Sequence, residues 1–144
     1  MVAVFTYGTL QVPKIFEAVT GTTAASKPAV LQDYARYGIR GQVFPGIIPE
    51  HGASVTGRYY FNIDVRTLAS IDEFEDVLYE RRTVHVNVGD KKRPAEAYVV
   101  SLPYRDWLNG RPWRLDTFRD RHLAGYISRC RRFSREFGNE NQSA

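Results

Sequence analysis

Residues 53–88 read ASVTGRYYFNIDVRTLASIDEFEDVLYERRTVHVNV, and the periodicity of this stretch changes twice. Residues 53–63 are rich in aromatic and β-branched side chains, which predicts a strand. Asp64 is a good N-cap for a helix that reaches Glu75, because its carboxylate can accept hydrogen bonds from the first free amides. From Tyr79 the apolar side chains recur at every second position. The stretch therefore predicts a strand, a helix and a second strand.

The chain on either side of this segment adds further strands. Residues 89–93 predict a turn into a strand at 95–102, which should pair with the preceding strand as a hairpin. Upstream, residues 2–6 form a short apolar run typical of a buried strand, and residues 7–11 a loop that follows it. Strands at 27–31 and 34–39 are also predicted. The glycines and prolines of residues 41–49 instead favour a structured loop or an edge strand.

Two further helices are expected. Pro13 suits the first turn of a helix and Gly21 its end. Asp116 is expected to cap a long helix. Its apolar side carries Phe118, Tyr126, Ile127, Cys130, Phe133 and Phe137. Several strands with few helices predict an α+β fold around a small sheet or barrel.

Length and composition agree with one globular domain. The chain has 144 residues, of which 43% are hydrophobic and 25% charged, so we expect a single domain at residues 1–138 and a flexible tail at 139–144. Cys130 is the only cysteine and cannot form an intrachain disulfide. The N-terminal residues lack the pattern of a signal peptide or a membrane span. We therefore expect a cytoplasmic location, and the sequence leaves the oligomeric state open.

The net charge of +4 arises in the C-terminal segment. The long helix carries Arg119, Arg121, Arg129, Arg131, Arg132 and Arg135. These arginines could form an anion-binding scaffold, but no recognised nucleic-acid motif or aromatic interleaving accompanies them. A solvated basic face is the favoured interpretation, and neither nucleic acid nor a membrane is expected as a partner.

Glu75 is the first candidate for chemistry. On a helical wheel it falls between Leu68 and Ile71, inside the apolar stripe, whereas Glu73 faces water. Removal from water disfavours the charged form of a carboxylate, so Glu75 should have a raised pKa and act as a base near neutral pH. The residues leave an alternative open, in which Glu75 forms a structural ion pair with Arg81 or Arg82.

The loop Tyr7-Gly8-Thr9-Leu10 is the second candidate. A glycine at the mouth of a loop lets backbone amides approach a ligand, and exposed amides bind carboxylates and oxyanions. Taken as a pattern alone, this loop is more often an ordinary turn. The histidines His51, His85 and His122 have no metal-like spacing, so no metal site is expected.

Three motifs in order along the chain carry a family resemblance. They are VFTYGTL at residues 4–10, YGIRGQVFPGIIP at 37–49 followed by VTGRYYFNI, and IDEFEDVLYERRTVHV at 71–86. Together they resemble the gamma-glutamylcyclotransferase-like family, especially its small branch with gamma-glutamylamine cyclotransferases and plant avirulence-induced proteins. The resemblance implies a compact, mixed or antiparallel β-barrel-like sheet flanked by helices, with a pocket at one end of the barrel.

The resemblance also assigns roles to residues. The family's YG[ST]L loop holds the glutamyl end of the substrate and corresponds to Tyr7, Gly8, Thr9 and Leu10. The catalytic glutamate ends the L-D-x-F-E pattern and corresponds to Glu75, with Ile71 in place of the leucine. Tyr79 and Arg81 match the family's Y-x-R and are expected to support the site.

The implied reaction is intramolecular. The alpha-amine of a small-molecule gamma-glutamyl amide or amine conjugate attacks the gamma-carbonyl, Glu75 acts as general acid and base, and 5-oxoproline and a free amine are released without metal or cofactor. The branch favours plain amines as leaving groups. A second carboxylate there would need a cationic partner, and Arg40, Arg81 and Arg82 are the nearest by motif position. The alternative is a non-catalytic module that binds a small carboxylate or a peptide end in the same pocket.

Overall fold

A computed structural model of the chain describes the backbone of residues 1–143 and the side chains of residues 1–137. Its strands are β1 (Val2–Thr6), β2 (Ser26–Ile39), β3 (Pro45–Ile63), β4 (Tyr79–Val88), β5 (Lys91–Val100) and β6 (Leu108–Pro112). Its α-helices are α1 (Pro13–Thr20), α2 (Val65–Glu75) and α3 (Leu115–Ser143). Short 3-10 turns form η1 (Thr9–Gln11), η2 (Asp76–Leu78) and η3 (Leu102–Trp107).

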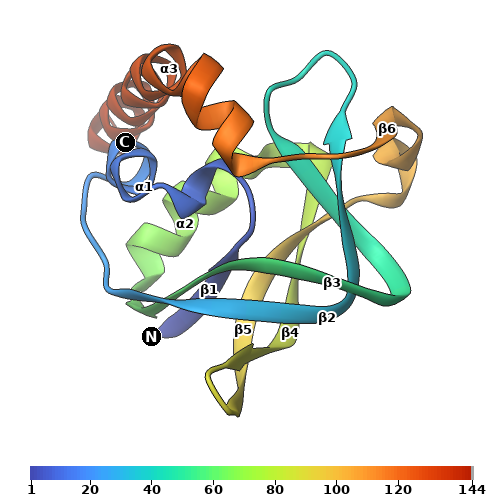
Figure 1. Ribbon diagram of the computed structural model, residues 1–144. Coiled ribbons are helices and arrows are strands. Elements are labelled where there is room, and N and C mark those ends of the chain that lie inside the picture. Colours follow the sequence, from blue (N-terminus) through green and yellow to red (C-terminus); the bar gives the residue numbers. More distant parts are fainter. Residues whose placement is uncertain (144) are drawn as a thin grey trace.

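The strands form a sheet that closes on itself (Figure 1). Their order is β3-β1-β5-β4-β2-β6, and β3 pairs again with β2, so that β6 alone extends the edge. The pairing of β1 with β5 is parallel, at Val4 and Glu96, and the other pairings are antiparallel. The predicted α+β class, with a mixed barrel-like sheet flanked by helices, is confirmed.

Strand β1 is buried on both of its faces. Phe5 packs inside the barrel, and its neighbour Val4 packs on the opposite face beneath the helices. Both side chains have no exposed surface. A strand covered on both sides needs apolar residues at successive positions, which is why residues 2–6 form a run rather than an alternation.

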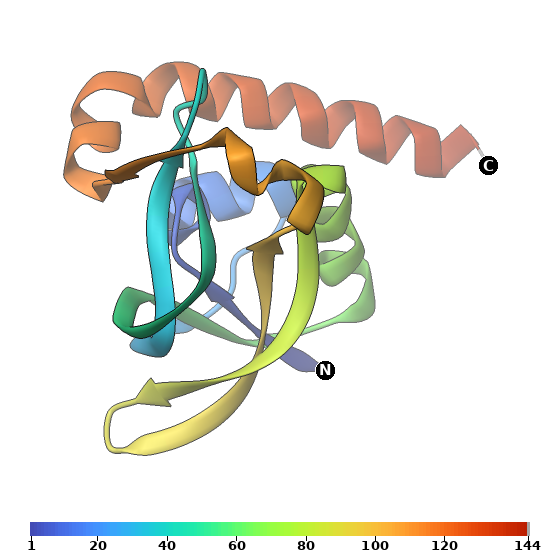
Figure 2. The same ribbon diagram turned by 90° about the vertical axis from the view of Figure 1, so that its right-hand side faces the viewer.

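The helices lie together on one side of the barrel (Figures 1 and 2). The predicted apolar side of α3 is confirmed, because Phe118, Tyr126 and Cys130 are buried there. The helix begins at Leu115, so Asp116 lies in the first turn rather than at the cap. The side chains of residues 139–144 lie outside the described part of the chain. The flexible tail expected there therefore stays a prediction.

One strand prediction needs correction, and the edge strand expected within residues 41–49 is found. Residues 27–31 and 34–39 belong to one strand, β2, with an irregularity between Gln32 and Tyr34. Asp33 at this point has a φ of 64°. Strand β3 begins at Pro45, so part of 41–49 is an edge strand whose residues 45–49 pair with β2. An edge tolerates Pro45 and Pro49 because no partner is needed for the missing N–H groups.

None of the helices within the described residues is long and apolar enough to cross a membrane.

Candidate functional site

The loop after β1 forms one wall of a cavity of about 220 Å³. The side chain of Tyr7 fixes this loop from the inside, because its hydroxyl donates a hydrogen bond to the carbonyl of Tyr98 at 2.6 Å. The carbonyl of Tyr7 accepts a hydrogen bond from Nη1 of Arg36 at 2.7 Å. Burial raises the pKa of the Tyr7 phenol well above its ordinary range, so it stays a neutral donor. The loop is therefore held by contacts from distant strands.

Gly8 is required by a close contact. A Cβ atom at this position would lie 2.9 Å from Cδ and Cγ of Pro45. The next residues turn into η1, where Gln11 donates its backbone N–H to the carbonyl of Gly8 at 3.1 Å. The first amides of a helical turn have no acceptor within the turn. In the described part of the chain, no acceptor is found for the amides of Gly8, Thr9 and Leu10.

Glu75 is the last residue of α2 and lines the same cavity as this loop. The predicted N-cap at the other end of α2 is confirmed, because Asp64 accepts a hydrogen bond from the amide of Thr67 at 2.8 Å. Burial, and secondarily the negative charge of Asp72, raise the pKa of Glu75 from 4.5 to about 8. Near neutral pH this carboxyl group is therefore close to its titration midpoint.

The ion-pair alternative for Glu75 is wrong. Arg81 pairs instead with Asp72 and Glu96, with N···O distances of 3.0 Å to each. Arg82 pairs with Glu80 at 3.0 Å. Within the described residues, no cationic side chain lies within ion-pair distance of Glu75. The carboxyl group is free to meet a ligand.

Tyr79 and Arg81 differ in their relation to the cavity. Tyr79 lines it, and its hydroxyl donates a hydrogen bond to the carbonyl of Pro45 at 2.6 Å. Arg81 does not line it but holds Asp72, which also accepts a hydrogen bond from the hydroxyl of Tyr98 at 2.6 Å. These contacts attach the end of α2 to β4 and β5, so Arg81 lies behind the cavity and not in it.

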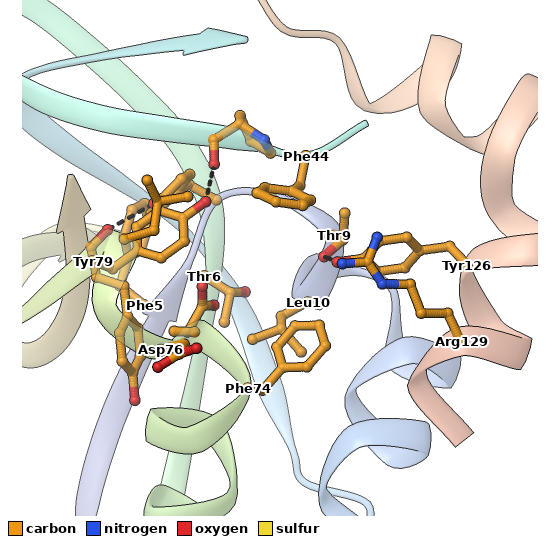
Figure 3. A pocket seen from close by; sticks show the side chains of 16 residues that line it. Phe5, Thr6, Thr9, Leu10, Phe44, Phe74, Asp76, Tyr79, Tyr126 and Arg129 are labelled. Atoms are coloured by element: carbon orange, nitrogen blue, oxygen red, sulfur yellow. Dashed lines mark hydrogen bonds between the residues drawn. The ribbon is translucent and has the colours of Figure 1, made fainter. Parts of the chain in front are cut away.

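Sequence reasoning missed the residues that reach the cavity from other parts of the chain. They are Phe44 before β3, Tyr98 on β5, and Tyr126 and Arg129 on α3. Figure 3 shows Tyr126 and Arg129 extending from α3 toward Thr9 and Phe44, across from Tyr79. The hydroxyl of Tyr126 lies 3.5 Å from Oγ1 of Thr9. The apolar period of α3 predicted that Tyr126 is buried, but no local signal identified its partner.

Arg129 is exposed, as expected for this helix, but it also lines the cavity. Its guanidinium carbon lies 5.5 Å from the ring centroid of Tyr126 and 5.9 Å from that of Phe44. Aromatic rings therefore do accompany this arginine, in contrast to the expectation from the sequence. The remaining arginines of residues 119–135 are exposed, as expected.

The structure thus brings Tyr7, Gly8, Thr9, Leu10, Glu75 and Tyr79 around one cavity. Their chemical roles stay predictions. Among the described residues, no three His, Cys, Asp or Glu side chains gather in a group that could hold a metal ion.

Comparisons with known proteins identify the family of this chain. The model of the family described as Gamma-glutamyl cyclotransferase, AIG2-like matches residues 4–115. AIG2-like protein D of Arabidopsis thaliana is 32% identical over 139 residues, which cover 94% of this chain and 91% of the relative. The chain belongs to the gamma-glutamyl cyclotransferase, AIG2-like family.

Solved structures show the same fold. A solution structure of an Arabidopsis thaliana protein has a TM-score of 0.69 at 28% identity, and the match covers 99% of this chain and 87% of that chain. The crystal structure of an AIG2-like protein from Mus musculus has a TM-score of 0.62 at 24% identity, covering 79% of this chain and 86% of that chain. At this lower identity the likeness concerns the fold alone.

Proposed function

We propose that this protein is a gamma-glutamyl cyclotransferase that converts a gamma-glutamyl amide or amine conjugate to 5-oxoproline and the free amine. One observation carries the proposal. Glu75, with a pKa raised to about 8, lines the same small cavity as a loop whose amides have no acceptor in the described residues. Membership of the family supports the same reaction.

The substrate supplies its own nucleophile. Its alpha-amine attacks the gamma-carbonyl carbon, so that a five-membered ring forms and the bond from that carbon to the leaving nitrogen breaks. Holding two reacting groups in the correct geometry can contribute roughly 7–11 kcal/mol toward the barrier. The cavity then has to select the substrate conformation in which the alpha-amine lies against the gamma-carbonyl. It also has to move protons from the attacking nitrogen to the leaving nitrogen.

Glu75 manages the proton transfers in this proposal. Its carboxylate accepts a proton from the alpha-ammonium, which frees the amine lone pair for attack, and the same carboxyl group then donates this proton to the leaving nitrogen. The ring nitrogen still carries one excess proton after attack, and the carboxylate passes this second proton to the departing amine, which leaves as an ammonium ion. A glutamate whose pKa is raised to about 8 is better matched to the substrate's ammonium group, so the first transfer is less unfavourable. A glutamate with an ordinary pKa would be a much weaker base.

The loop binds the glutamyl end of the substrate. The amides of Gly8, Thr9 and Leu10 can donate hydrogen bonds to the alpha-carboxylate, or to the oxyanion that develops on the gamma-carbonyl. These donors are fixed before the substrate arrives, because Arg36 and Tyr98 hold Tyr7 at the start of the loop. Donors held in advance need little reorganisation during the reaction.

The test is release of 5-oxoproline from a panel of gamma-glutamyl compounds by the purified protein. Glu75→Gln keeps the shape of the side chain and removes the base, so we expect turnover to fall by about 10²- to 10⁴-fold. Glu73→Gln is the matched control, because Glu73 is exposed on the same helix and does not line the cavity. Equal loss in both variants would remove Glu75 from the mechanism. Binding of 5-oxoproline without turnover of any compound would support a non-catalytic carboxylate-binding module.

A further inference from the structure

The side of the cavity formed by α3 carries a cation that the proposed reaction does not use. Arg129 is the only lysine, arginine or histidine among the described residues that line the cavity. Its guanidinium lies over the rings of Tyr126 and Phe44. None of the aspartate and glutamate side chains described lies within ion-pair distance of it.

This geometry suits the binding of a carboxylate. A guanidinium that stacks on aromatic rings is oriented by them, while the N–H groups along its edge stay available. Two of these N–H groups can donate parallel hydrogen bonds to one carboxylate, which is stronger and more specific than contact with a single point charge. Arg40, Arg81 and Arg82, the cations nearest the site by motif position, do not line the cavity.

The position of Arg129 indicates which part of the substrate it meets. Tyr7, Thr9 and Leu10 are buried, so the glutamyl end that they hold occupies the enclosed part of the cavity. Glu75 has to reach the scissile amide, and the leaving group extends from there toward the exposed lining residues. Those residues are Arg129 and Asp76. Asp76 would repel an anion, and it lies away from Arg129 in Figure 3.

We propose, on the basis of the function above, that Arg129 binds a carboxylate on the leaving amine and makes the enzyme select gamma-glutamyl amino acids. Phe44 and Tyr126, the rings beneath the guanidinium, provide an apolar surface for the side chain of that amino acid. Arg129 is then a specificity-determining residue contributed by α3. This reverses the preference for plain amines that the sequence suggested.

The experiment compares two substrates that differ only in this carboxylate. They are gamma-glutamyl-leucine and gamma-glutamyl-leucinamide, and the measured quantity is the ratio of their kcat/KM values for 5-oxoproline release. We expect the wild-type protein to favour the acid by about 10- to 100-fold, the range for a hydrogen bond to a charged group. In Arg129→Gln this ratio should fall to near one. In Arg129→Lys, which keeps the positive charge, the ratio should lie between these two values.

Arg132→Gln is the matched control, because Arg132 is exposed on the same helix and does not line the cavity. It removes the same charge and should keep the wild-type ratio. A wild-type ratio near one would overturn the role of Arg129 and leave the cyclotransferase reaction standing. Equal loss for both substrates in Arg129→Gln would also overturn it, since Arg129 would then hold the alpha-carboxylate. No 5-oxoproline from either substrate or from the wider panel would overturn both proposals.

Discussion

Opposite faces of the same strands build two different cores. The interior of the barrel is mainly aliphatic, with small residues on several strands. It contains Phe5, Tyr7, Ala29, Leu31, Ile47, Val55, Val84, Val86, Ala95, Ala97 and Val99. The core beneath the helices is richer in large aromatic residues. It includes Phe16, Tyr60, Tyr98, Phe118 and Tyr126 together with aliphatic side chains.

The two cores differ in their structural role as well as in the size of their side chains. In the barrel, small side chains let the strands close, and a Cβ on Gly57 would lie only 2.1 Å from the backbone oxygen of Thr6. Beneath the helices, buried tyrosines anchor the loop and the helix end by their hydroxyl groups. Tyr60, for example, donates to the carbonyl of Leu10 at 2.9 Å. The barrel holds the fold closed and anchors the start of the loop through Tyr7, and the helix side positions the rest of the candidate site.

A pair of truncations should separate these two roles. Leu31 inside the barrel is 2% exposed, and Ile71 on α2 is fully buried. Each change to alanine removes buried methyl groups and should lower the free energy of unfolding by about 2–5 kcal/mol. Only Ile71→Ala should also lower 5-oxoproline release, because it loosens the turn of α2 that carries Glu75. Urea denaturation and turnover of the folded variants measure both quantities, and a larger turnover loss in Leu31→Ala would contradict the division of roles.

Glu75, on the helix side, should make the folded protein less stable as the pH rises toward 8. The folded protein keeps a proton on Glu75 up to about pH 8, whereas the unfolded chain releases it near 4.5. Between these values the folded state binds more protons, so this group lowers the stability as the pH rises. Glu75→Gln has no such proton, and its advantage over wild type should grow from near zero toward roughly 5 kcal/mol across this interval, at about 1.36 kcal/mol for each pKa unit.

Denaturation of both proteins at several pH values tests the sign of this effect. The charged or ionisable groups around Glu75 are Asp72 on α2, Asp76 after it, Tyr7 in the loop, Tyr79, Tyr98, and Tyr126 with Arg129 on α3. The tyrosine pKa values are raised above 10 by burial, so these phenols stay neutral throughout the interval. A Glu75→Gln variant that is less stable than wild type above neutral pH would indicate a structural ion pair instead.

The elements that the sequence predicted well depend on local signals. The alternation of β4, the N-cap of α2 and the apolar stripe of α3 each lie within one segment, and all three are found. The burial of Glu75 follows from the same helical period. The loop at Tyr7 was identified only because a glycine follows a buried strand and because the family motif matches there.

The contacts that complete the site could not be predicted in this way. The hydroxyl of Tyr7 meets a carbonyl 91 positions away, and Thr9 meets Tyr126 across 117 positions. No periodicity encodes such pairs, because they depend on how the barrel closes and where α3 crosses it. Pro45 illustrates the limit, since its local sequence indicated an edge strand or a loop but not that β2 is its partner.

A substitution at Gly8 should weaken binding in the cavity more than it lowers the stability of the fold. An alanine there would bring its Cβ to 2.9 Å from the ring of Pro45, so this ring has to move. The carbonyl of Pro45 accepts the 2.6 Å hydrogen bond from Tyr79, and a shift would disturb this wall of the cavity. We expect the affinity for 5-oxoproline to fall about tenfold, or about 1.4 kcal/mol, with a smaller change in stability.

Gly125→Ala is the control for this substitution. Gly125 lies within α3, and a Cβ there meets no atom within 4 Å. Alanine in an exposed helical position should stabilise the protein by up to about 1 kcal/mol and leave binding unchanged. Titration of 5-oxoproline into both variants decides the matter. Equal affinities for Gly8→Ala and wild type would mean that the contact between Gly8 and Pro45 supports the fold and not the cavity, because a site shaped by that contact cannot tolerate the displaced ring.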